Sequence, residues 1–219
     1  MCVGSHGSAN IEAIVRLKPD FVLMSDLDSQ SKIHESLAKW RVSHLGYKAM
    51  SVRDIVDTAW DFGQRFGVAE GAAIWIAYMD KVMLDARAAA PADMPKVLFC
   101  AGRDPGSFDR IYIAGRGNFY EEIVQLCGGT NAYAGTLSTP MVSAESVLKM
   151  NPDIIFDLLV GAGENDIRQA INDWARLSSV NAVKNGRVHI LTESWASRPG
   201  PRIDMLIETV SRHLQHYKQ

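Results

Sequence analysis

Two segments that lie far apart in this chain repeat the same pattern of residues. Residues 11–23 read IEAIVRLKPDFVL and residues 144–156 read AESVLKMNPDIIF, and the two copies align without a gap. A helix-capping residue, Asn10 or Ser143, precedes each copy, and apolar residues at helical spacing follow it. A proline then ends each helix, and the short apolar run after it is typical of a strand buried in a parallel sheet. A single repeat of such long period predicts two like-folded α/β halves, not a solenoid of many short units.

The alternation of helix and strand continues after each copy of the repeat. We expect a helix, a strand and a helix in each half, at 31–40, 47–52 and 53–66 in the first and at 165–177, 187–192 and 202–217 in the second. The second half also opens with a strand at 96–101 and a helix from Asn118 to Cys127. Parallel α/β architecture is typical of this alternation. Because nothing equivalent precedes the first copy, we expect the first half to lack its opening strand and helix.

A long helical segment separates the two halves. Residues 68–90 contain no proline and many helix-favouring residues, and prolines follow them closely. We therefore expect residues 1–67 to form an N-terminal α/β lobe, 68–91 a connecting backbone helix, and 92–219 a C-terminal α/β lobe. The predicted fold is two Rossmann-like lobes with parallel sheets, joined by one long helix that limits their motion to a small rocking.

Composition and motifs exclude several classes of function. The formal net charge is −2, so the chain lacks the basic field that attracts nucleic acid. No apolar run reaches the roughly 20 residues that span a membrane, and the first ten residues lack the pattern of an export signal. Cys2, Cys100 and Cys127 form no CxxC pair, and the motifs GxSxG, GxGxxG and HExxH are absent. We therefore predict no metal site and no catalytic residues, with Cys100 and Cys127 as buried thiols.

Four segments give the chain a family resemblance that covers almost its whole length. They are NIEAIVRLKPDFVL from Asn10, IAGRGNFYEEIVQLCGGTNAY from Ile113, SAESVLKMNPDIIF from Ser143 and RPGPRIDMLIETV from Arg198. In these segments the chain resembles the vitamin B12 and ferric-siderophore binding proteins of bacterial ABC importers, which belong to the helical-backbone class of periplasmic binding proteins. Members typically carry a further N-terminal strand and helix, which agrees with the shortened first lobe expected here.

The resemblance implies a binding protein and not an enzyme. Such a protein captures a metal chelate (a cobalt corrinoid, a ferric siderophore or haem) in the cleft between its lobes. It delivers this ligand to an ABC permease in the membrane, which works with its ATPase, and it needs no intrinsic cofactor. The implied location is periplasmic or membrane-anchored and extracytoplasmic, with the export signal absent from this chain. Two alternatives stay open: a nitrogenase-like or chelatase-like metallocofactor enzyme or scaffold, and a ligand-free interaction module.

Ligands of open parallel sheets bind beyond the carboxyl ends of the strands, and this rule selects most candidate ligand residues. The candidates are Ser25 and Asp26 after the first-half strand, Arg103 and Phe108 after the strand at 96–101, Tyr112 in the long loop that follows, Trp195 and Arg198 after the strand at 187–192, and His6 before the first repeat helix.

Trp195 is the strongest of these candidates. In the B12-binding family a tryptophan in a segment similar to TESW packs on the ligand, and a flat ring suits a macrocycle. Arg103 and Arg198 could bind ligand carboxylates, amides or phosphate. Phe108 and Tyr112 could stack on the ligand, or the tyrosine could ligate haem iron, and the N-terminal histidine could reach the cleft or a metal. The alternatives are packing within the lobe for the rings, solvation for the arginines, and an incidental loop position for the histidine.

Acidic side chains are candidates for contacts with the permease. Family members dock through one acidic residue on each lobe, which meets arginines of the two permease subunits. By position the candidates are Glu35 in the first lobe and Glu164 in the second, with ordinary solvated carboxylates as the alternative. A dimer formed over an exposed sheet edge could complete the shortened first lobe.

Overall fold

The computed structural model describes residues 4–5, 8–25 and 31–217. Its contacts divide the chain into two units, one within residues 1–49 and the other within residues 50–219. Each unit combines helices with a sheet that contains parallel strands, so the predicted α/β class is confirmed. Within the described ranges, no helix is both long and apolar enough to cross a bilayer.

The first unit contains the first copy of the repeat. Its elements are β1 (Gly4–Ser5), β2 (Ser8–Ala9), α1 (Ile11–Arg16), β3 (Val22–Ser25), α2 (Ser31–Lys39) and β4 (His44–Tyr47). β3 pairs in parallel with β4, and Val22 lies opposite His44. The buried apolar side chains in the described part of this unit are Ile14 and Leu37. The small number of buried side chains indicates a thin core.

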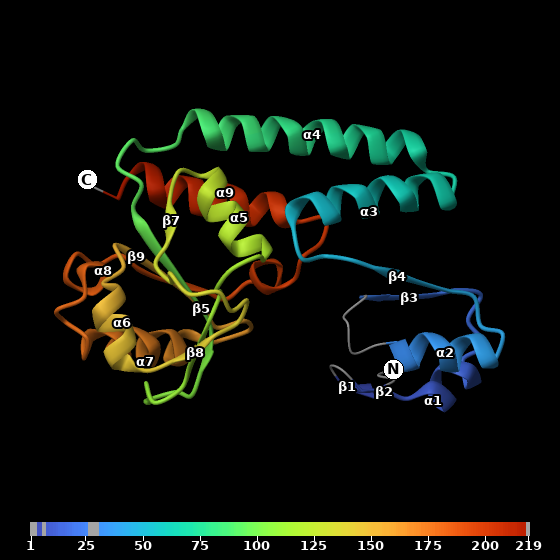
Figure 1. Ribbon diagram of the computed structural model, residues 1–219, viewed down its shortest axis with the longest axis horizontal. Helices are drawn as coiled ribbons and strands as arrows, with labels where there is room; N and C mark the ends of the chain where they lie inside the picture. Colours follow the sequence, from blue (N-terminus) through green and yellow to red (C-terminus); the bar gives the residue numbers. More distant parts are fainter. Residues whose placement is uncertain (1–3, 6–7, 26–30, 218–219) are drawn as a thin grey trace. The chain divides into compact units, whose positions relative to one another are not determined.

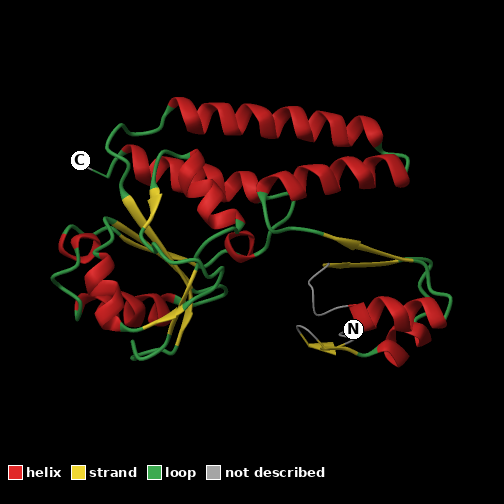
Figure 2. Ribbon diagram, viewed as in Figure 1, coloured by secondary structure: helices red, strands yellow, loops and turns green. Residues whose placement is uncertain are grey.

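The second unit is a three-layer α/β/α arrangement (Figures 1 and 2). Its elements are α3 (Val52–Arg65), α4 (Ala69–Ala88), β5 (Lys96–Arg103), β6 (Ile111–Ile113), α5 (Phe119–Leu126), β7 (Thr130–Asn131), β8 (Met141–Val142), α6 (Ala144–Met150), β9 (Ile154–Leu158), α7 (Glu164–Ala175), α8 (Asn181–Lys184), β10 (Val188–Leu191), the 3-10 helix η2 (Ser194–Ser197) and α9 (Ile203–Gln215). The strand order is β10-β9-β5-β6-β8, with β7 also paired to β5.

Alternate residues of the central strand β9 pack against opposite helical layers. The ring of Phe156 lies 5.6 Å from that of His213 on α9 and stacks 4.8 Å from that of Phe99 on β5. Its neighbour Ile155 belongs to the other core cluster, which includes Trp174 of α7. Since both faces are covered, β9 is a continuous buried run, as the sequence predicts for a strand inside a parallel sheet.

The two copies of the repeat share their backbone conformation. The side chain of Asn10 accepts a hydrogen bond from the Ala13 amide, and that of Ser143 accepts one from the Ser146 amide. Each helix then ends at a left-handed residue directly before the proline, with φ of 47° at Lys18 and 44° at Asn151. This left-handed ending frees the chain to turn into the strand that follows. The structure therefore bears out the helix-to-strand unit predicted from each copy.

Some elements differ from the sequence expectation. β4 ends at Tyr47, where the sequence predicts a strand at 47–52, because Ser51 instead caps α3 in a reciprocal capping box with Asp54. The predicted loop between β5 and α5 contains β6, which pairs antiparallel with β5 and β8. The sheet of the second unit is therefore parallel at β10, β9, β5 and β7 and antiparallel at β6 and β8.

The helix expected at 68–90 is α4, and it does not stand alone. It packs beside α3, and Gly63 of α3 lies so close to α4 that an added Cβ would meet the Ala72 side chain at 2.5 Å. The Trp75 indole donates a hydrogen bond to the Pro201 carbonyl, and Tyr78 donates one to Asp204 at the start of α9. The contacts therefore assign α3 and α4 to the second unit, whereas the sequence places the end of the first lobe at residue 67.

Candidate functional site

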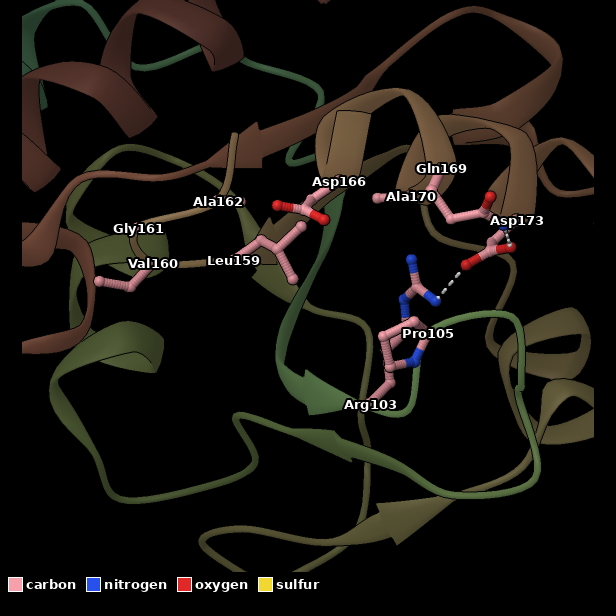
Figure 3. A pocket seen from close by; sticks show the side chains of 10 residues that line it. All are labelled: Arg103, Pro105, Leu159, Val160, Gly161, Ala162, Asp166, Gln169, Ala170 and Asp173. Atoms are coloured by element: carbon pink, nitrogen blue, oxygen red, sulfur yellow. Dashed lines mark hydrogen bonds and ion pairs between the residues drawn. The ribbon is translucent and has the colours of Figure 1, made fainter. Parts of the chain in front are cut away.

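The second unit has a pocket at the carboxyl ends of β5 and β9. Its volume is about 320 Å³, and one face of α7 closes one side of it. Figure 3 shows the residues that line it: Arg103, Pro105, Leu159, Val160, Gly161, Ala162, Asp166, Gln169, Ala170 and Asp173. This is the edge at which open parallel sheets bind ligands.

A buried ion-pair network forms the floor of the pocket. The Nε of Arg103 donates to Asp157 at 3.1 Å, and its Nη1 donates to Asp173 at 2.8 Å. The side chains of these three residues are 3%, 1% and 4% exposed. Burial opposes the charged forms, but the hydrogen bonds outweigh it: the pKa of Arg103 is raised, and the pKa of Asp173 is lowered. The shifts of these two pKa values favour the ionised forms of Arg103 and Asp173, and the single guanidinium serves two carboxyl groups.

Neighbouring groups fix this network in place. The Trp174 indole donates to Asp157 at 2.7 Å, and the Gly106 amide and the Gln169 side chain each donate to Asp173 at 2.8 Å. The Arg103 guanidinium also lies 5.1 Å from the centre of the Phe108 ring. These contacts join β5, β9, α7 and the segment after β5, so the polar groups of the pocket are held by rigid elements.

The segments that follow β9 and β10 run beside each other. The Leu159 amide donates to the Leu191 carbonyl, and the Gly161 amide donates to the Thr192 carbonyl. The segment after β10 leads into η2, which carries the half-buried Trp195. The Tyr120 hydroxyl of α5 donates to the Ala196 carbonyl at 2.9 Å and anchors η2 to the unit. Trp195 and the pocket therefore belong to the same edge of the sheet.

The candidate residues of the second unit fall into two groups. Phe108 is 7% exposed and packs in the core, and Arg103 is held in the ion-pair network, so little of either side chain is accessible and their binding roles stay predictions. Tyr112 on β6 is 45% exposed, Trp195 is half-buried, and Arg198 is exposed. These three side chains are accessible to a ligand, and their binding roles stay predictions.

The candidates of the first unit are only partly described. Ser25 is the last residue of β3, at the carboxyl end of a parallel strand as expected. Asp26 and His6 lie outside the described residues. The predicted docking residues, Glu35 on α2 and Glu164 at the first turn of α7, are both exposed, and their role stays a prediction.

Sequence reasoning missed most of the pocket. The carboxyl-end rule was applied to the strands corresponding to β3, β5 and β10, but it applies equally to β9 and would have selected Leu159 and Val160. A second signal is Asp157, an acidic residue inside the apolar run IIFDLL, which indicates a buried cationic partner. The α7 residues Asp166, Gln169 and Asp173 carry no comparable local signal.

The structure describes Cys100 and Cys127 of the three cysteines in the chain. Among the described residues, no three histidine, cysteine or carboxylate side chains group as a metal site. Cys100 and Cys127 are buried thiols, as predicted. Burial raises the pKa of Cys127 to about 12, and burial together with Asp157 raises the pKa of Cys100 well above its usual value. Both thiols are therefore protonated at neutral pH.

The chain is similar to known proteins over almost its whole length. Residues 2–194 match the sequence model of a family described as periplasmic binding protein. A vitamin B12-binding protein of Vibrio vulnificus (strain YJ016) is 26% identical over 218 residues, which cover 99% of this chain and 77% of that protein.

Solved structures show the same fold. The periplasmic vitamin B12-binding protein BtuF of Vibrio cholerae superposes with a TM-score of 0.80 at 24% identity, over 99% of this chain and 82% of that one. The periplasmic heme-binding protein RhuT of Roseiflexus sp. RS-1 has a TM-score of 0.80 at 18% identity, over 97% and 81% of the two chains.

Proposed function

We propose that this chain, which belongs to the periplasmic binding protein family, is the solute-binding component of an ABC importer for a metal chelate. In this proposal it binds the chelate outside the cytoplasm and passes it to a membrane permease without changing it chemically. The ligand classes are a corrinoid, a ferric siderophore and haem. The observation that carries the proposal is the alignment of 99% of this chain with a relative named as a vitamin B12-binding protein.

The geometry of the second unit supports binding at its carboxyl edge. Trp195 offers a flat ring whose position is restricted because it is half-buried. The exposed Tyr112 offers a second ring for stacking, and the exposed Arg198 offers hydrogen-bond donors. The pocket at the carboxyl ends of β5 and β9 is formed by rigid elements before any ligand arrives, which lowers the entropic cost of binding.

Isothermal titration with cyanocobalamin, haemin and a ferric hydroxamate tests the proposal directly. We expect saturable 1:1 binding of at least one of these chelates. Trp195→Ala should weaken that binding by about tenfold or more, because it removes a large contact surface. Trp60→Ala on α3, where the tryptophan is 49% exposed and far along the sequence from the predicted ligand loops, is the matched control. Failure of all three chelates to bind would contradict the proposal.

Delivery to a permease requires a docking surface that is separate from ligand binding. We propose Glu35 and Glu164 for this role, since both carboxylates are exposed on helices. Charge reversal at either residue should reduce stimulation of the ATPase of a reconstituted cognate importer and leave chelate affinity unchanged. Charge reversal at Glu208 on α9 is a control with similar exposure. Full stimulation by both variants would remove these two residues from the docking surface.

A further inference from the structure

Beyond the proposed function, and resting on it, we propose that the pocket between β5, β9 and α7 recognises a primary carboxamide arm of the chelate and discriminates against a carboxylate arm. The pocket pairs one available hydrogen-bond donor with one available acceptor. Neither the family match nor the relatives assign a role to these residues. The argument follows from the donor, the charge, the acceptor and the size of the pocket.

The donor is the third nitrogen of Arg103. Its Nε and Nη1 are bonded to Asp157 and Asp173, whereas Nη2 has no hydrogen bond to any described residue. Figure 3 shows this nitrogen directed into the space between Asp166 and Gln169. The rest of the side chain is buried and fixed, so Nη2 presents an N–H donor to a group that enters the pocket.

The local charge opposes an anionic guest. Asp157 and Asp173 already more than balance the guanidinium, and Asp166 adds a third carboxylate at the pocket wall. One guanidinium among three carboxyl groups leaves excess negative charge, of which Asp157 and Asp173 are shielded from water while Asp166 is exposed. A ligand carboxylate would lose hydration and gain repulsion, whereas the neutral carbonyl of an amide can accept from Nη2 at little electrostatic cost.

The acceptor is Asp166 in the first turn of α7. One of its oxygens accepts a hydrogen bond from the Gly163 amide at 3.0 Å, which fixes the orientation of the side chain. The other oxygen has no bond to a described residue and is available to accept from the NH₂ group of an amide. A primary carboxamide supplies both complementary groups, with its carbonyl toward Arg103 and its NH₂ toward Asp166. A carboxylate lacks the donor.

The size of the pocket fits one arm of a ligand and not a whole chelate. Its volume of about 320 Å³ is at the lower end for small-molecule sites, and Leu159, Pro105 and Ala170 give it apolar walls. Apolar walls accommodate the methylene stem of such an arm, while Asp166 and Arg103 meet its polar tip. Corrinoids carry several primary amide arms, whereas porphyrins such as haem carry carboxylates.

The test compares cyanocobalamin with its separated monocarboxylic acids, in which one amide arm at a time is hydrolysed. Affinities are measured by isothermal titration at pH 7. We expect at least one acid isomer to bind about tenfold more weakly than the parent, because a hydrogen bond to a charged group is lost and repulsion is added. Asp166→Asn removes the repulsion and supplies a donor, so it should reduce that ratio to below about threefold. Asp109→Asn, at an exposed carboxylate outside this pocket, should leave the ratio unchanged.

The outcomes separate this inference from the proposed function. Equal affinity for the amide and for every acid isomer, or an unchanged ratio in Asp166→Asn, would overturn amide recognition while binding itself stands. Binding of haemin without binding of cyanocobalamin would also overturn it and leave the importer function intact. If no chelate binds at all, both proposals fail together. Thermal unfolding of Asp166→Asn near the wild-type temperature shows that the variant is folded.

Discussion

Arg103 holds two carboxylates that come from different elements, Asp157 on β9 and Asp173 on α7. Because all three side chains are buried, removing the cation leaves two uncompensated negative charges inside the lobe. We expect Arg103→Met to lower the free energy of unfolding by about 3–5 kcal/mol. Urea unfolding followed by circular dichroism measures this change.

A variant of an exposed ion pair shows how much of the expected loss of stability depends on burial of the pair. Arg110 pairs with Asp104 at 3.2 Å, but these side chains are 62% and 66% exposed. Water screens such a pair, so Arg110→Met should cost less than about 1 kcal/mol. Similar losses in the two arginine variants would show that the network of Arg103 is not the stabilising feature described above.

At the scale of single residues, the sequence located the edge of the sheet where the pocket lies better than it located the side chains that line the pocket. The carboxyl-end rule selected Arg103 and Trp195 from their strands alone. It could not show that two of the three guanidinium nitrogens of Arg103 are hydrogen-bonded to Asp157 and Asp173, because those residues lie more than fifty positions away in the chain. Partners brought together only by tertiary packing leave no periodic signal in a single sequence.

The helices α3 and α4 approach each other closely at a glycine. An added Cβ at Gly63 would lie 2.5 Å from the Cβ of Ala72, so Gly63→Ala must push the helices apart. We expect a loss of about 1–3 kcal/mol in unfolding free energy from this overpacking. Gly71→Ala on α4 is the control, because its Cβ would meet nothing within 4 Å and alanine favours helix. Denaturant unfolding should therefore show opposite signs for the two substitutions, and equal effects would contradict the close approach.

The contact between β10 and α9 contains two stacked histidines. The rings of His189 and His213 lie 3.7 Å apart at 30°, and each lies 5.6 Å from Phe156. Burial, with a smaller effect of His213, lowers the pKa of His189 to about 4. Burial, with a smaller effect of Arg212, lowers the pKa of His213. Both rings are therefore neutral in the folded protein at neutral pH.

This pair predicts how stability depends on pH. An unfolded histidine binds a proton below about pH 6.5, whereas His189 in the native protein does so only near pH 4. As pH falls through this window, the histidine is protonated in the unfolded chain but not yet in the native protein. The free energy of unfolding therefore falls by about 2 kcal/mol. His189→Phe should flatten this part of the pH profile in urea unfolding between pH 7 and 4.5. An unchanged profile in His189→Phe would contradict the assignment.

At the scale of the whole molecule, the internal repeat was the most informative signal. It predicted two α/β halves, and the left-handed residues Lys18 and Asn151 show that the match extends to the backbone. The sequence did not reveal that α3 belongs with α4, because that contact depends on the fit of Gly63 against Ala72. It also did not reveal β6, a three-residue strand between β5 and β8 that is too short for an alternating pattern to be distinctive.

The strand of the repeat is buried more deeply in the second unit than in the first. This difference in burial predicts a difference in local stability. β9 is buried at every position, whereas Leu23 in its counterpart β3 is 48% exposed. In the described part of the first unit only Ile14 and Leu37 are buried apolar side chains, so little apolar surface opposes local opening.

Hydrogen–deuterium exchange with mass spectrometry should show the β3 amides exchanging at least about 100-fold faster than those of β9. The β4 amides should follow β3 and the β5 amides should follow β9, since each pair shares a ladder. Equal protection of β3 and β9 would mean that the first unit has stabilising contacts beyond those of its described residues.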